Sequence, residues 1–270
     1  MSAHLAHEYE HMVSAFSFEL SKCNDHIVMG NMIKRLNNID FNLAKMVAQN
    51  VGVEPPAEAV RPNHGKKDKY LSQAMFMPKT PTIAARRIAI LVADGFDLTQ
   101  VTAVRAALTG QGANCFIIGP RRGPIKSSST RHHPETDLGA DFSWEGGRST
   151  QFDALYVPGG AQSALILRES GRAIHWVREA FHHCKAIAAS DDGVDFIQSA
   201  CQLPGIQLAL TPSDTTPVVH MGVVTVSTFG VLHELKVMMR GGTDFISLFA
   251  QEISNHRCWE RSELAAKVAA

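Results

Sequence analysis

Apolar positions along the chain follow two different spacings, which change near residue 86. Up to about residue 53 they recur every three or four residues, with one stripe ending at Leu20 and a second over residues 33–47. This spacing puts apolar side chains on one face of a helix. Asn24-Asp25, between the two stripes, suits a turn and a helix cap. Residues 1–53 are therefore predicted to form two amphipathic helices.

A proline-rich segment, residues 54–85, follows the helical pattern. Its prolines are Pro55, Pro56, Pro62, Pro78 and Pro81. Because proline breaks helices and favours an extended chain, this segment is predicted to be a linker. Two amphipathic helices bury too little surface to be stable alone. Residues 1–53 are therefore expected to be the helical end of a larger body.

From residue 86 onward, short apolar runs alternate with helical patterns. The runs are residues 88–92, 115–118, 154–157, 186–189 and 223–226. Such runs are typical of buried parallel strands, and strands that alternate with helices form a doubly wound sheet. The predicted fold class is α/β with a mostly parallel sheet over residues 86–255, preceded by the small helical segment. A closing helix is expected over residues 231–252, interrupted at Gly241-Gly242, and residues 256–270 form a tail.

Composition excludes several functional classes. The formal net charge is +0, which argues against a general nucleic-acid or anionic-membrane binder. No apolar run approaches the roughly 20 residues of a membrane helix. The first ten residues lack the basic start and apolar stretch of an export signal. We therefore expect no nucleic-acid or membrane partner and, by default, a cytoplasmic location.

His7-Glu8-Tyr9-Glu10-His11 has the HExxH spacing of zinc enzymes. On a helix, two histidines four residues apart can hold zinc while the glutamate acts as a base. The extended form of this motif needs a glycine and a third histidine, and Ser14 and Ser17 stand at those positions. The favoured interpretation is an exposed polar helix face, and no metal site is predicted.

Two turns carry the candidate chemistry. The strand at residues 154–157 ends in Pro158-Gly159-Gly160, which puts backbone amides at the carboxyl edge of the sheet, where such folds bind ligands. A plain strand-to-helix turn explains these glycines equally well. Ser190-Asp191-Asp192-Gly193 runs from a strand through a sharp turn into a helix, as a nucleophile elbow does.

Together with residues 88–108, these turns resemble the DJ-1/PfpI family, a flavodoxin-like branch of the class I glutamine amidotransferase-like fold. The resemblance places Asp191 where that family has its nucleophilic cysteine. It places Gln100 where the family has an acidic partner, and a neutral amide cannot act as a base or activate a thiol. Cysteine chemistry is therefore not expected. Asp191 and Asp192 are instead expected to cap the following helix.

Three further segments narrow the resemblance. Residues 11–24 and 36–53 are similar to the helical end of the core of large-subunit haem catalases, and His256-Arg257-Cys258-Trp259-Glu260-Arg261 is similar to their closing motif in the fungal style. Those enzymes carry a DJ-1-like domain without its catalytic residues after the haem core. All three segments occur in the same order in this chain.

The resemblance implies a homotetrameric parent that holds haem and disproportionates hydrogen peroxide. Its iron ligand would be a tyrosine with an arginine four residues before it, because a tyrosinate needs nearby positive charge. The tyrosines here are Tyr9, Tyr70 and Tyr156, and the residues four before them are Leu5, Lys66 and Phe152. None fits, so no catalytic residue and no cofactor is assigned to this chain.

The leading expectation is a non-catalytic module that packs on a catalase core and neighbouring subunits, stabilises the assembly and offers apolar patches for chaperone-like binding. The alternative is a stand-alone DJ-1/PfpI-like hydrolase or a protein that binds a small anion at Gly159 and Gly160. The candidate residues are the elbow Ser190, Asp191, Asp192 and Gly193, its partner Gln100, and the two glycines.

Overall fold

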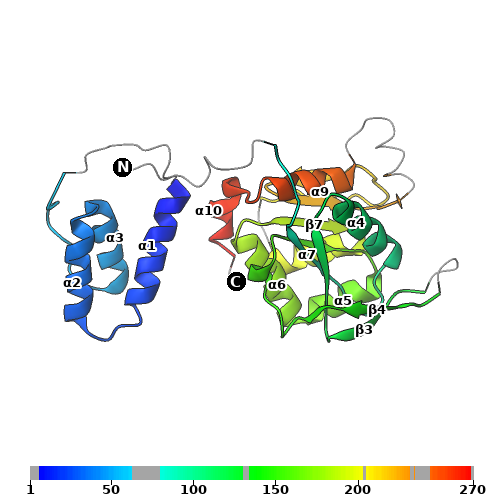
Figure 1. Ribbon diagram of the computed structural model, residues 1–270, viewed down its shortest axis with the longest axis horizontal. Coiled ribbons are helices and arrows are strands. Elements are labelled where there is room, and N and C mark those ends of the chain that lie inside the picture. The colour runs from blue at the N-terminus through cyan, green and yellow to red at the C-terminus, as the bar shows by residue number, and fades with distance from the viewer. Residues whose placement is uncertain are drawn as a thin grey trace. The chain divides into compact units, whose positions relative to one another are not determined.

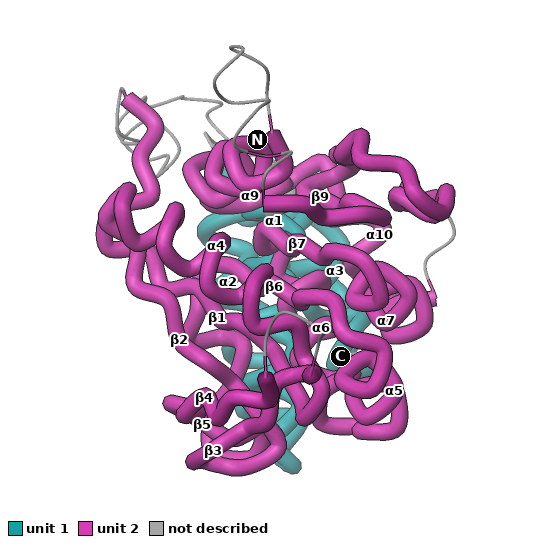
Figure 2. Tube along the Cα trace, turned by 90° about the vertical axis from the view of Figure 1, so that its right-hand side faces the viewer, with its two compact units in different colours: residues 1–79 teal, residues 80–270 magenta. Residues whose placement is uncertain are grey.

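The structure is a computed structural model that describes residues 6–62, 80–129, 134–202, 205–231, 234 and 244–268, without the side chains of Ala6 and His7. Figure 2 shows that the chain divides into two compact units, residues 1–79 and residues 80–270. We call them the helical unit and the α/β unit and describe each by itself.

The helical unit contains three helices where the spacing predicted two. They are α1 (Ala6–Leu20), α2 (His26–Asn37) and α3 (Phe41–Val51) (Figure 1). The prediction of one helix in the second half of the unit is wrong, because the chain forms two helices there. Asp40 accepts a hydrogen bond from the Leu43 amide at 2.9 Å and starts a new helix. Asp25 caps α2 in the same way through the Ile27 amide at 2.7 Å. The apolar stripe runs across the break because both helices turn it toward one small core.

The α/β unit is built on a seven-stranded sheet in the order β5-β2-β1-β6-β7-β9-β8. The strands are β1 (Arg87–Leu91), β2 (Asn114–Gly119), β5 (Phe142–Ser143), β6 (Ala154–Val157), β7 (Ala186–Ser190), β8 (Val218–His220) and β9 (Val223–Val226). All neighbours pair in parallel except β8 and β9. The order from β2 to β9 is that of a flavodoxin-like sheet. The predicted α/β class is confirmed.

Helices cover both faces of this sheet (Figure 1). On one face lie α5 (Ala161–Glu169), α6 (Gly171–His182) and α7 (Asp192–Cys201); on the other lie α4 (Leu98–Gly110) and α9 (Phe245–Ser254). Successive residues of β1 serve the two faces, with Ala89 and Leu91 in the first core and Ile88 and Ile90 in the second. Burial on both faces explains why the strands read as continuous apolar runs.

Short elements complete the unit. Strands β3 (Gly123–Lys126) and β4 (Asp137–Ala140) form a separate antiparallel pair, η2 (Ser149–Gln151) precedes β6, and η3 (Trp259–Arg261) and α10 (Ser262–Ala265) follow α9. The pair β3-β4 lies in a polar stretch for which no strand was predicted, since short exposed strands carry little apolar signal. Of the predicted closing helix, the structure describes α9, which begins after the cap Asp244. Gly241-Gly242 lies outside the described residues.

The three central strands are parallel and in register, so their first residues lie at one edge of the sheet and their last residues at the other. Ile88 of β1 pairs with Ala154 of β6, and Ala154 pairs with Ala186 of β7. The loops at the carboxyl edge therefore bring the elbow, the glycine loop and the start of α4 together. The residues just before the strands meet at the opposite, amino-terminal edge.

Candidate site at the elbow turn

The turn between β7 and α7 has the strained backbone of an elbow. Asp191 has φ 47° and ψ −127°, a conformation that side-chain-bearing residues seldom adopt. Its amide still donates to the Val226 carbonyl oxygen of β9 at 3.0 Å, so the strained conformation lies directly at the end of the hydrogen bonding between β7 and β9. Gly193 lies so close to β6 that a Cβ there would be 2.6 Å from the Val157 carbonyl oxygen. Glycine is therefore required for α7 to start at this point.

The Asp191 carboxylate is turned inward and bonded on both sides. Its Oδ1 accepts a hydrogen bond from the Phe229 amide at 2.9 Å, and its Oδ2 accepts one from the Gln100 amide nitrogen. The prediction that Asp191 caps α7 is wrong, because its side chain makes no capping bond to that helix. The two donors on the far side of the turn hold the carboxylate away from the helix amides. Burial raises the pKa of Asp191, and the two donors act in the opposite direction.

Gln100 is the centre of the network. It lies in the first turn of α4, only 3% exposed, behind the cap Asp97. Its Oε1 accepts hydrogen bonds from the Gly159 amide at 2.8 Å and from the Ser190 hydroxyl at 2.7 Å. Because both contacts need an acceptor, Nε2 must point to Asp191. An amide fits this position better than a carboxylate, since it alone accepts on one side and donates on the other.

Ser190 links the network to a buried tyrosine. Its hydroxyl donates to Gln100, so the Tyr156 hydroxyl, 2.8 Å away, is the donor to Ser190. Burial raises the pKa of Tyr156 strongly. Tyr156 therefore donates to Ser190 and Ser190 donates to Gln100, and both hydroxyl groups stay protonated.

The glycine loop is bonded within the protein. The Gly159 amide donates to Gln100, and the Gly160 amide donates to the Asp192 carboxylate at 3.0 Å. A Cβ at Gly160 would be 2.3 Å from the Gly95 carbonyl oxygen, and φ is 123° there. Both amide hydrogens thus have internal acceptors, and the loop's small residues are explained by close packing on the β1–α4 turn. Asp192 serves this loop and points away from Asp191.

The structure places every candidate residue at one location, and it adds two that the sequence did not suggest. Tyr156 was considered only as a possible iron ligand, although its register beside Ser190 follows from neighbouring parallel strands. Phe229 takes part only through its backbone amide, so its residue type carries no signal.

Thiol chemistry has no group in position at the elbow. Cys184 precedes β7 and Cys201 ends α7, at opposite ends of these elements from Asp191. Burial raises the pKa of both thiols, to about 12 for Cys201. A thiol held in its protonated form is a poor nucleophile.

The described tyrosines do not fit a haem ligand. The Tyr9 hydroxyl donates to Asp40 at 3.2 Å, and burial together with that carboxylate raises its pKa to about 12. Tyr156 is fully buried against Ser190. Ligation of iron requires a tyrosinate, which both surroundings disfavour. Tyr70 lies outside the described residues.

Metal ligation finds no support within the described ranges. They hold no group of three histidine, cysteine, aspartate or glutamate side chains that could bind an ion. In the HExxH segment, Glu8 and His11 lie on α1, and the side chain of His7 is outside what is described. No described helix has both the length and the apolar character to cross a membrane.

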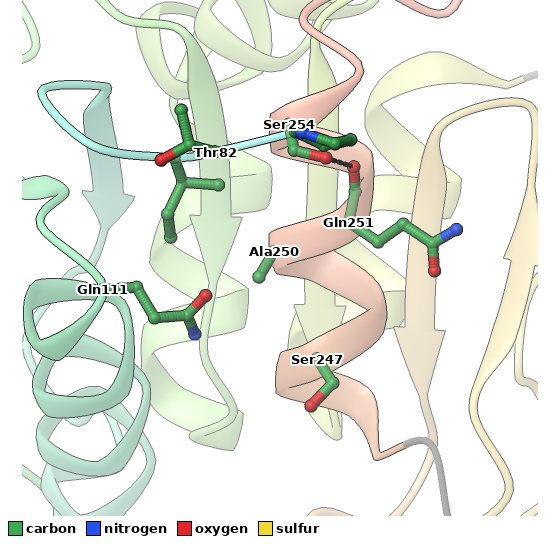
Figure 3. A pocket seen from close by; sticks show the side chains of 8 residues that line it. Thr82, Gln111, Ser247, Ala250, Gln251 and Ser254 are labelled. Atoms are coloured by element: carbon green, nitrogen blue, oxygen red, sulfur yellow. Dashed lines mark hydrogen bonds between the residues drawn. The ribbon is translucent and has the colours of Figure 1, made fainter. Parts of the chain in front are cut away.

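A groove away from the elbow offers shape without reactive groups. Figure 3 shows it between α9, the end of α4 and the segment before β1. Its volume is about 430 Å³. Its lining residues are Pro81, Thr82, Ile83, Gln111, Ser247, Ala250, Gln251 and Ser254. All are uncharged, so the groove supplies no acid or base.

Comparison with known proteins places this architecture in a family. The model of the C-terminal domain found in long catalases matches residues 84–263, and the model named catalase-related immune-responsive matches residues 6–51. Catalase-1 of Neurospora crassa is 40% identical over 258 residues, and Catalase A of Aspergillus fumigatus is 39% identical over 262 residues; each match covers 94% of this chain and 34% of the relative. Catalase HPII of Pseudomonas aeruginosa is 35% identical over 214 residues, which is 78% of this chain and 29% of the relative. The chain therefore spans about a third of the length of these relatives.

Proposed function

This chain belongs to the long catalases, matching their carboxyl-terminal part, and we propose that it acts as a non-catalytic module of a larger haem enzyme. The parent reaction would be the disproportionation of hydrogen peroxide to water and oxygen. The haem and its ligands would come from the part of the relatives that this chain does not match. The role of the module would be to stabilise and assemble that enzyme as a tetramer.

One observation carries the proposal. At the elbow, the polar atoms that chemistry would need are used within the protein. Asp191 stands in the reactive position, and both of its oxygens accept internal hydrogen bonds, from Phe229 and Gln100. A carboxylate held in this way is directed at the protein and not at a substrate. The stand-alone hydrolase is disfavoured for the same reason, and methylglyoxal turnover that Asp191→Ala abolishes would revive it.

The helical unit supports the assembly role. Its core is small, and large apolar side chains remain on its outside, with Phe18 63% exposed, Ile27 74% exposed and Ile39 73% exposed. Exposed apolar side chains on a small unit are typical of an interface. We assign this surface to the haem-bearing core of the parent.

The experiment combines the chain with a truncated relative. Catalase-1 of Neurospora crassa, shortened by the part that this chain matches, is mixed with the purified chain, and oxygen evolution is followed during heating. The proposal expects association in size-exclusion chromatography and slower thermal inactivation. The double variant Ile27→Glu, Ile39→Glu is expected to lose both effects, while Arg122→Glu, on an exposed loop of the α/β unit, retains them. Equal protection by the unmutated chain, the double variant and Arg122→Glu would contradict the assignment of this surface to the haem-bearing core.

The same surface supports a second role, chaperone-like binding of unfolded clients. Apolar side chains at the surface can bind exposed apolar segments of other proteins. The purified chain is added to a client enzyme that aggregates on heating, and light scattering is recorded. Suppression that the double variant abolishes is expected; unchanged aggregation would end this part of the proposal.

A further inference from the structure

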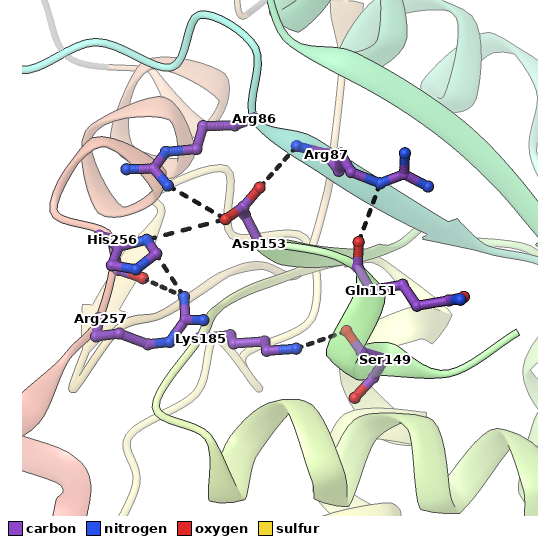
Figure 4. A network of polar contacts seen from close by, with 8 residues as sticks. All are labelled: Arg86, Arg87, Ser149, Gln151, Asp153, Lys185, His256 and Arg257. Carbon is purple, nitrogen blue, oxygen red and sulfur yellow. Dashed lines mark hydrogen bonds and ion pairs between the residues drawn. The ribbon is translucent and has the colours of Figure 1, made fainter.

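A cluster of basic side chains lies at the amino-terminal edge of the sheet, opposite the elbow. Arg86 precedes β1 and Lys185 precedes β7, while Asp153 precedes β6 between them. The segment after α9 adds His256 and Arg257, as Figure 4 shows. The Cys258 amide bonds to the Cys184 carbonyl oxygen at 2.8 Å and fastens this segment to the start of β7.

Asp153 is the carboxylate at the centre of the cluster, and its oxygens are already engaged. Oδ2 accepts the Arg87 amide at 2.9 Å. Oδ1 accepts Nη1 of Arg86 at 3.2 Å and lies 3.9 Å from Nδ1 of His256. Burial lowers the pKa of His256, so the one cation that Asp153 pairs with is Arg86, and Lys185 and Arg257 add further positive charge.

Lys185 donates to a carbonyl oxygen instead of a carboxylate. It is 3% exposed, and its Nζ donates to the Ser149 carbonyl oxygen at 2.5 Å. The nearby Glu179 carboxylate is turned to Ser149, accepting its hydroxyl at 2.6 Å and its amide at 3.2 Å. Burial first, and Arg257 second, lower the pKa of Lys185 to about 8. The region is thus more positive than its carboxylates can balance.

Arg257 has side-chain donors without a hydrogen-bond acceptor in the part of the chain that the structure describes. It is partly buried, and Nη1 donates to the His256 carbonyl oxygen at 2.8 Å and approaches Nδ1 of the same residue. Its Nε and Nη2 donate to no residue in the described ranges, and neither do Nε and Nη2 of Arg86. These nitrogens are not among the buried polar atoms that lack a partner, so they are open to water and to an anion that could accept their hydrogen bonds.

The backbone at His256 fixes the direction of its side chain. The residue has φ 66° just after α9 ends, a position that glycine occupies more easily. The conformation directs the imidazole to Asp153 and leaves it 36% exposed, beside Arg86 at 26%. A left-handed residue directly after a helix end is a common way for a helix to stop, and here it also places the imidazole in the cluster. Access from solvent is open to a small ligand.

We propose that Arg86, His256 and Arg257 bind a small oxyanion of the phosphate class. The free guanidinium donors form the planar fork that suits two oxygens of one tetrahedral anion, and the imidazole adds a third donor. Partial burial strengthens these charge-assisted bonds, because fewer water molecules compete for them. This site is independent of the elbow and of the assembly role.

The test is calorimetric titration of the full chain with inorganic phosphate at constant ionic strength, with chloride as the compensating ion. Saturable one-to-one binding is expected. Arg257→Gln should bind roughly tenfold more weakly or worse, since a charge and its hydrogen bonds are lost together. Arg122→Gln removes one positive charge from an exposed loop and should bind phosphate as tightly as the unmutated chain does.

His256→Gly provides a variant that is expected to stay folded. Glycine accepts the positive φ, so the thermal midpoint should not fall, while phosphate affinity decreases. Non-saturable heats with the parent chain would overturn the proposal. So would equal affinities for Arg257→Gln and Arg122→Gln.

Discussion

The hydrogen bonds at the elbow have a fixed polarity, and exchanging the two side chains tests it. In the native pair, the Gln100 amide donates to the Asp191 carboxylate while Oε1 accepts from Gly159 and Ser190. Asp191→Asn replaces one acceptor oxygen by a donor. Either orientation of the new amide then faces a donor, Nε2 of Gln100 or the amide of Phe229. One buried donor stays unpaired, which costs about 2 kcal/mol of unfolding free energy.

Gln100→Glu fails in the opposite way. It places a second carboxylate against Asp191 in a buried site, and one of the two must take up a proton. We expect a loss of about 3 kcal/mol at neutral pH, with partial recovery in mild acid as the shared proton binds. The control Gln207→Glu makes the same chemical change on an exposed side chain and is expected to stay within about 0.5 kcal/mol of the parent chain.

The double variant Gln100→Glu, Asp191→Asn restores every pairing and reverses the direction of the one hydrogen bond between positions 100 and 191. The new carboxylate at position 100 would accept from Gly159, from Ser190 and from the new amide nitrogen at position 191. The oxygen of that new amide would accept from Phe229. The stability of the double variant should return to within about 1 kcal/mol of the parent chain, a coupling energy of roughly 4 kcal/mol between the two sites. Additive losses would refute the assigned network.

Urea unfolding followed by tryptophan fluorescence suits this cycle. The chain has three tryptophans, Trp144, Trp176 and Trp259, and all belong to the α/β unit. The signal therefore reports the unit that contains the elbow. Unfolding free energies at 25 °C and equal slopes for the four proteins give the coupling energy directly.

Three further predictions concern other parts of the molecule. The folded-state pKa of Lys185, about 8, lies below its unfolded value of 10.5, so the unfolded chain binds more protons between these pH values. The unfolding free energy should therefore rise by roughly 3 kcal/mol from pH 8 to pH 10.5. Lys185→Met should remove this pH dependence, measured by urea unfolding at pH 8 and pH 10, and an unchanged pH dependence would contradict the assignment. Gly193→Ala should lower the unfolding free energy by about 3 kcal/mol or prevent folding, because its Cβ would be 2.6 Å from a backbone oxygen, whereas Gly171→Ala meets no atom within 4 Å and should be neutral in the same assay. Ile39→Glu should leave the circular-dichroism melting curve of the chain unchanged, since the side chain is 73% exposed, and a large drop would mean that this residue belongs to the core.

Much of the α/β unit could be predicted from the sequence, because strands buried on both faces leave continuous apolar runs. The runs before Gly159 and Ser190 indicated the position of both turns, and these are local signals carried by residue type and spacing. Gln100 was identified only through the resemblance to the DJ-1/PfpI family. The short strands β3 and β4 carry none, since they are mostly exposed.

The direction of side chains could not be predicted in the same way. Asp191 looked like a helix cap, yet its carboxylate is drawn to donors from α4 and from the loop at Phe229. The cluster around Asp153 joins Arg86, which is 67 residues away in the sequence, to the still more distant His256, and only the folded sheet brings the two to the same carboxylate. The break at Asp40 was hidden because both helices continue one apolar stripe.

The central claim is that this chain supplies structure and no haem chemistry of its own. The most direct test is an absorption spectrum of the purified chain after incubation with haem, together with oxygen evolution from hydrogen peroxide. The account predicts no stoichiometric Soret band and no oxygen above free haem. A stoichiometric Soret band with turnover would contradict it, and would mean that this chain holds a haem site of its own.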